Sequence, residues 1–75
     1  MDETLRVGDR VKVYLDSNFW KSEGWFEGTV QHIDPYSGHR SFYWVELDVA
    51  VQTVQGGSTN LVSVLNLNNI KRPNE

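Results

Sequence analysis

The chain has 75 residues, including three tryptophans, three tyrosines and three phenylalanines, with no cysteine and a formal net charge of −3. A chain of this length forms one domain with a thin core, because it buries only about 60% of its unfolded surface. The lack of cysteine excludes a disulfide framework and a thiolate metal site, and the acidic balance argues against a nucleic-acid binder, which needs a basic face.

No apolar run approaches the roughly 18 residues of a membrane span, and Met1-Asp2-Glu3 does not resemble the start of a signal peptide. We therefore expect a cytoplasmic protein with no membrane association. Residues 1–75 are expected to form a single domain with frayed ends at 1–4 and 74–75. At this size, packing of aromatic side chains or association between copies supplies much of the stability.

Residues 5–15 alternate between apolar and polar side chains, which predicts a half-buried strand. The apolar set that points to one side is Leu5, Val7, Val11, Val13 and Leu15. Gly8-Asp9 interrupts the pattern, so a turn or kink is expected before the first full strand. The basic residues gather at the two ends of the chain, which lie side by side in a small barrel: Arg6, Arg10, Lys12, Lys71 and Arg72.

Residues 16–23 show no periodicity and begin with Asp16-Ser17-Asn18, so they are expected to form a loop. Phe19 and Trp20 are unusual inside such a loop. Either they fold back as a lid over one end of the barrel, or they stand in the solvent and bind a partner.

Residues 24–34 predict the long central strand of the fold. Phe26, Gly28 and Val30 share one face, since side chains alternate along a strand. Ile33 would fall on the opposite face, so we expect a bulge near Gln31-His32 that returns it to the core. Gly28 suits a place where the strand coils sharply or another backbone comes close.

The second half of the chain predicts further strands separated by turns. Residues 34–38 (DPYSG) favour a turn, 40–48 a strand that continues through 49–55, 56–60 a flexible hairpin loop, and 61–65 another strand. Residues 66–69 favour a single 3-10 turn before a last short strand at 70–72, which Pro73 ends. The expected core is Val11, Val13, Phe26, Val30, Ile33, Tyr43, Val45, Leu47, Val64 and Ile70.

This order of elements predicts an all-β fold, a small antiparallel barrel of five to six strands with a 3-10 turn before the last strand. It resembles the SH3-like barrels, and residues 7–13, 24–30 and 67–73 look like those of Tudor and Agenet domains. The resemblance implies an aromatic cage for methylated lysine or arginine beside an acid. The residues here that would form it are Trp20, Trp25 and Trp44, with Glu46 or Asp48.

Two other families of the same fold show weaker similarity. Type II dihydrofolate reductases are similar in Gly8-Asp9-Arg10-Val11 and in residues 62–70, with Ser63 and Leu65 at the positions of a ligand-contacting glutamine and tyrosine. That resemblance implies an oligomeric enzyme with a pore formed by four copies. The small SH3-like subunit of photosystem I is similar in residues 28–30 and 56–58, and it docks acidic electron carriers through a basic surface, whereas this chain is acidic.

Catalysis finds little support in the sequence. The only histidines are His32 and His39, and their spacing matches no metal motif with enough partners. The loop at residues 56–59 lacks the lysine and helix of a phosphate-binding loop. We therefore expect no catalytic residue, no metal and no cofactor.

The aromatic residues exceed what so small a core holds, and we expect the surplus to bind a protein or peptide partner or a second copy. A methylated ammonium group would gain about 0.5–2 kcal/mol per cation–π contact, and the same residues suit an interface between copies. The alternatives are an oligomeric reductase and a small nucleic-acid-binding barrel. The candidate binding residues are Phe19, Trp20, Trp25, Phe42, Trp44, Glu46 and Asp48.

Overall fold

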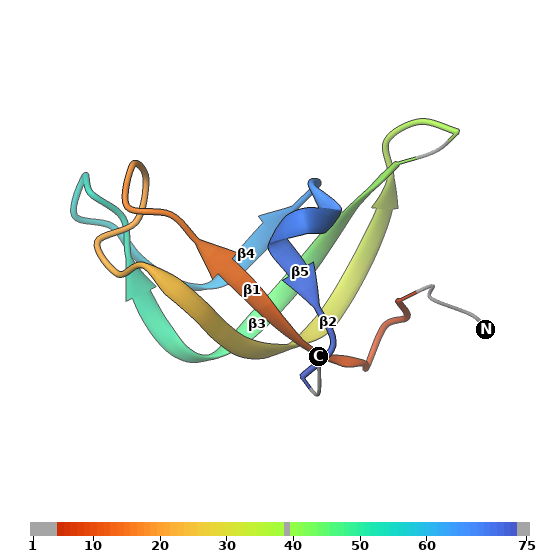
Figure 1. The fold of residues 1–75 in the computed structure, drawn as a ribbon, viewed down its shortest axis with the longest axis horizontal. Coiled ribbons are helices and arrows are strands. Elements are labelled where there is room, and N and C mark those ends of the chain that lie inside the picture. Colours follow the sequence, from red (N-terminus) through yellow and green to blue (C-terminus); the bar gives the residue numbers. More distant parts are fainter. Residues whose placement is uncertain (1–4, 39, 74–75) are drawn as a thin grey trace.

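A computed structural model describes residues 5–38 and 40–73, which form five strands and one short 3-10 turn (Figure 1). The elements are β1 (Arg10–Leu15), β2 (Gly24–Pro35), β3 (Ser41–Gln52), β4 (Ser58–Val64), η1 (Leu67–Asn69) and β5 (Ile70–Lys71). The predicted all-β fold and the 3-10 turn before the last strand are confirmed. The fraying expected at 1–4 and 74–75, and one of the two histidines, His39, lie outside the described residues.

The five strands form one antiparallel sheet in the order β4-β3-β2-β1-β5. The two basic ends of the chain meet as expected, since Lys12 on β1 lies opposite Lys71 on β5. Within residues 5–38 and 40–73 no ladder joins β4 to β5, so the sheet is open. A slot of about 280 Å³ separates the end of β1 from β4, with Trp20 and η1 at its rim, and closure into a barrel stays a prediction.

The central strand carries the predicted bulge. Val30 pairs with Val45, but the next pair joins His32 to Trp44, so the register between β2 and β3 shifts by one residue. After the shift Ile33 lies opposite Tyr43, and both side chains pack against the core. The extra residue changes which side chains of β2 face inward, because alternation restarts after a bulge.

Gly28 marks the closest approach of β2 to β3. It lies between Val11 on β1 and Leu47 on β3. A Cβ atom at this position would stand 2.5 Å from the carbonyl oxygen of Glu46 and 2.9 Å from the Cα of Leu47. Real side chains do not tolerate such distances, so only glycine allows the sheet to coil this tightly here.

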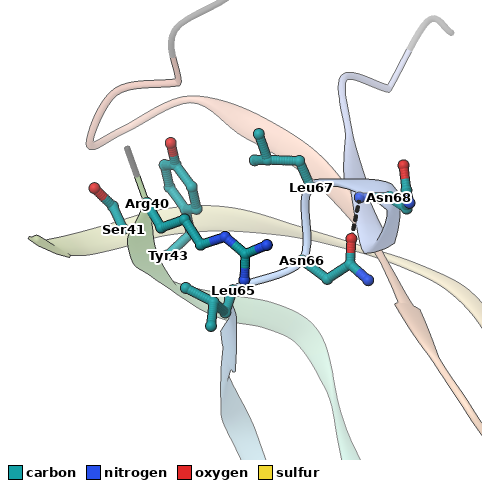
Figure 2. Close-up of a pocket in the computed structure, with 7 residues that line it drawn as sticks. All are labelled: Arg40, Ser41, Tyr43, Leu65, Asn66, Leu67 and Asn68. Carbon is teal, nitrogen blue, oxygen red and sulfur yellow. Dashed lines mark hydrogen bonds between the residues drawn. The ribbon is translucent and has the colours of Figure 1, made fainter. Parts of the chain in front are cut away.

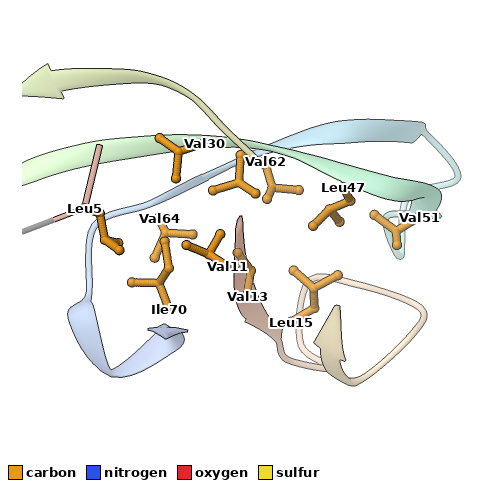
Figure 3. Packing of buried hydrophobic residues seen from close by; sticks show 11 residues of the cluster. Leu5, Val11, Val13, Leu15, Val30, Leu47, Val51, Val62, Val64 and Ile70 are labelled. Carbon is orange, nitrogen blue, oxygen red and sulfur yellow. The ribbon is translucent and has the colours of Figure 1, made fainter. Parts of the chain in front are cut away.

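The core lies on the concave side of the coiled sheet (Figure 3). Phe26, Ile33 and Tyr43 are partly buried against it, as is Trp20. All ten predicted core residues therefore belong to the core or pack against it. Its buried members are Leu5, Val11, Val13, Leu15, Val30, Val45, Leu47, Val51, Val62, Val64 and Ile70.

Two predictions about individual segments are wrong. Val7 is 61% exposed rather than core-facing. Gly8 adopts φ +97° in a turn that Asp9 closes by donating its N–H to the carbonyl of Arg6, which breaks the alternation before β1 begins. The hairpin loop lies at residues 53–57 rather than 56–60, because Thr53 donates its backbone N–H to the carbonyl of Gly57 at 2.8 Å and β4 already starts at Ser58.

We expect Gly28→Ala to destabilise the fold by about 1–3 kcal/mol, because the added methyl group forces β2 and β3 apart. Urea denaturation followed by tryptophan fluorescence measures the free energy of unfolding. Gly38→Ala is the matched control, since a Cβ atom at Gly38 meets nothing within 4 Å. Equal stability of the two variants would contradict the close approach.

Candidate functional site

The surface that faces away from the core is uncovered in the described part of the chain, where the only helical element is the three-residue η1. We call this surface the outer face. Its side chains alternate with the buried ones along each strand. Reading across β5, β1, β2 and β3, it carries Lys71; Arg10, Lys12 and Tyr14; Trp25, Glu27 and Thr29; and Phe42, Trp44, Glu46 and Asp48.

The seven predicted binding residues fall into three separate groups. Four of them form one row on the outer face of β3: Phe42, Trp44, Glu46 and Asp48. Trp25 lies at the opposite end of the same face, and His32, the cross-strand partner of Trp44, is about 20 Å further along β2 at about 3.3 Å per residue. Phe19 and Trp20 lie in the loop before β2. The structure therefore does not bring the three tryptophans together into one cage.

The loop that holds Phe19 and Trp20 folds back onto the end of β3. Trp20 bridges Thr53, and Val54 donates its N–H to the carbonyl of Phe19 at 2.9 Å. The Trp20 ring packs against the core and meets the Phe19 ring edge-to-face at 5.0 Å. Trp20 thus covers one end of the core, whereas Phe19 is exposed to solvent.

Trp25 is 41% exposed and is held in place by two neighbours. The Tyr14 ring meets it edge-to-face at 5.5 Å, and the Nζ atom of Lys71 lies 4.3 Å from its ring centroid. Tyr14 donates its hydroxyl to Glu23 at 2.7 Å, and this hydrogen bond, together with desolvation, raises the pKa of Tyr14. A methylated ammonium ligand would have to compete with Lys71 for this ring.

The row on β3 is fixed by polar contacts with β2. The indole Nε1 of Trp44 donates to Asp34 at 3.2 Å, and the other carboxylate oxygen of Asp34 lies 2.7 Å from His32 Nε2. Glu46 accepts from Gln31 at 2.9 Å. These contacts depend on the bulge, because it turns His32 and Asp34 toward the outer face opposite Trp44 and Phe42.

Arg10 joins three strands on the outer face. Its guanidinium donates two hydrogen bonds to Asp48, at 2.9 and 2.6 Å, and a third to Thr29 at 3.0 Å, with Glu27 at 3.6 Å. The hydrogen bond from Arg10 lowers the pKa of Asp48, and in turn raises that of Arg10. The groups are exposed, so this pair orders the surface more than it stabilises the fold.

Charge on the outer face is divided between its two halves. The strands β5 and β1 carry Lys71, Lys12 and Arg10, whereas β2 and β3 carry Glu27, Glu46 and Asp48. The expected binding residues did not include Tyr14 or Lys71, which the structure places around Trp25. The signal that was available is the pairing of the two chain ends, which sets Lys71 beside β1 and hence beside Trp25.

A separate pocket of about 320 Å³ opens between the start of β3 and η1 (Figure 2). Arg40 is its only charged lining residue, Tyr43 and Leu65 form its wall, and Asn66 caps η1 by accepting the backbone N–H of Asn68 at 2.9 Å. None of the seven predicted binding residues lines it. Among the described residues, no group of three or more acidic, histidine or cysteine side chains is placed to hold a metal ion.

Comparisons with protein-family models, with curated protein sequences and with solved structures gave no match. Across residues 5–38 and 40–73 there is also no helix with the length and apolar character that crossing a bilayer requires. The function of this chain is therefore argued from its own residues and their geometry.

We expect the pKa of Asp48 to rise toward its ordinary value in Arg10→Gln and to stay low in Lys12→Gln, which removes the same charge without touching Asp48. NMR titration of the side-chain carboxyl carbon measures both. Because folding lowers this pKa, the pair stabilises the protein above the ordinary pKa of aspartate, and that contribution is lost as the pH falls through the lowered value. Identical titration curves in all three proteins would contradict the role given to Arg10.

Proposed function

We propose that the chain is a non-catalytic interaction module, which binds a protein or peptide partner, or itself, through the aromatic residues of the outer face. The observation that carries the proposal is Trp25. Its ring is 41% exposed, stands on a strand at the centre of the sheet and is oriented by Tyr14 and Lys71.

Tryptophan in such a position is an efficient anchor for a partner. Its large apolar ring gains free energy when the remaining exposed surface is covered, and tryptophan is enriched among the interface residues whose truncation costs about 2 kcal/mol or more. Because its neighbours already fix the ring, little conformational entropy is lost on binding. The division of charge between the basic β5–β1 half and the acidic β2–β3 half would orient the partner.

The fold supports the same proposal. A five-stranded antiparallel sheet, a bulged central strand and a 3-10 turn before the last strand are the features on which the resemblance to SH3-like barrels of the Tudor type is based. We infer that the chain is such a barrel. The aromatic cage of those domains is not part of the proposal, since Trp20, Trp25 and Trp44 lie apart.

One observation favours a second candidate, the binding of single-stranded nucleic acid. Lys12 and Lys71 lie opposite each other next to the exposed Trp25 and to Tyr14, and bases stack on aromatic rings beside cations that contact phosphates. The candidate ranks second, because Glu27 lies directly opposite Lys12 on β2 and the chain is acidic as a whole.

We expect Trp25→Ala to lose binding to its protein partner by about 30-fold, the equivalent of about 2 kcal/mol, while its thermal unfolding changes little. The wild type and the variant are immobilised, exposed to nuclease-treated extract of the source cells, and compared by quantitative mass spectrometry. Tyr36→Ala, which removes an exposed aromatic ring from the β2–β3 turn, is the matched control and should retain the partner.

Two outcomes would overturn the proposal. If Trp25→Ala and the wild type enrich the same proteins equally, the outer face does not bind through Trp25. If the wild type instead binds a 20-residue oligothymidylate at low salt, with an affinity that falls steeply as salt rises and that is lost in Trp25→Ala, the nucleic-acid candidate replaces it.

A further inference from the structure

The two edges of the sheet differ in how they are protected. The edge strand β5 has only two residues, includes Lys71 and is followed by Arg72 and Pro73, and short length, positive charge and proline are the devices that keep an edge from pairing. The other edge strand, β4, has seven residues with no charge and no proline. One edge of this sheet is therefore guarded and the other is not.

The unguarded edge also lies in the neutral part of the chain. No aspartate, glutamate, lysine or arginine occurs between Asp48 and Lys71, so the net charge of −3 resides entirely on other residues. Two copies of an acidic protein repel each other over most of their surfaces. At β4 they meet without like charges, which makes a second copy the occupant that this edge suits.

The backbone of β4 offers free groups at one position in particular. The N–H and C=O of Leu61 both contact the hydroxyl of Thr59, at 3.1 and 3.3 Å, and are satisfied within the strand. Residues two apart in an antiparallel strand direct their peptide groups to the same side. Ser63 therefore points its N–H and C=O to the open edge, and the described residues give these two groups no partner.

We propose that two copies of the chain pair β4 with β4 in antiparallel orientation, about a two-fold axis at Ser63. The two Ser63 residues then exchange N–H···O=C hydrogen bonds, and the exposed Leu61 of each copy lies opposite Leu65 of the other. The pairing uses the unguarded edge of both copies at once, so the assembly closes at two and leaves only guarded β5 edges.

This pairing does not involve Trp25. The outer face of each copy stays open in the ten-stranded sheet, and the dimer would present two partner-binding surfaces. The proposal goes beyond the interaction module and is tested separately from it, because the variants that test it leave Trp25 and its neighbours unchanged.

Sedimentation equilibrium between about 1 and 100 μM tests the pairing. The wild type should approach twice the chain mass, and Ser63→Lys, which sets two positive charges against each other at the axis, should weaken dimerisation at least 10-fold. Ser17→Lys makes the same chemical change in an exposed loop and should leave the dimer intact. A wild type that stays monomeric, equal effects of the two lysine variants, or masses above the dimer would overturn the proposal.

A cross-linking experiment keeps the proposal testable even if Ser63→Lys fails to fold. The chain has no cysteine, so Ser63→Cys introduces a single thiol, and paired residues at a two-fold axis lie within the Cα separation that a disulfide spans. Under mild oxidation Ser63→Cys should convert to a covalent dimer much faster than Ser17→Cys. Equal rates for the two variants would exclude the β4 pairing.

Discussion

The structure depends on the close approach of the β2 and β3 backbones at Gly28. A side chain at this position would collide with the carbonyl oxygen of Glu46 and with the Cα of Leu47, so the sheet coils here only because the residue has none. The coil brings Val11 on β1 and Leu47 on β3 to either side of the glycine. A single layer of five strands can then enclose an apolar core on its concave side without a second layer.

The same coil decides what remains on the surface. Because the concave side takes the small aliphatic residues, the larger rings of Trp25, Phe42 and Trp44 are left on the outer face. The bulge then turns His32 and Asp34 outward, so that Asp34 meets the Trp44 indole. The organisation of the outer face and that of the core thus have the same cause, a central strand that first coils and then shifts register by one residue.

Features set by local periodicity could be predicted from the sequence, and features set by contacts between strands could not. The role of Gly28 and the bulge after Val30 follow from the pattern of one strand, and both are present. Val7 was misplaced because a positive φ at Gly8 interrupts an otherwise regular alternation. The spacing of Trp25 and Trp44 depends on the register of β2 and β3, which no single strand encodes, and the pairing of Lys71 with Trp25 depends on β5 lying beside β1.

The register of β2 against β3 on the two sides of the bulge is the most direct test of this account, since both the core and the outer face depend on it. Cross-strand backbone nuclear Overhauser effects measure it without any substitution. The account predicts contacts between Val30 and Val45 before the bulge and between Ile33 and Tyr43 after it. A contact between Ile33 and Phe42, which an unshifted ladder would give, would contradict it.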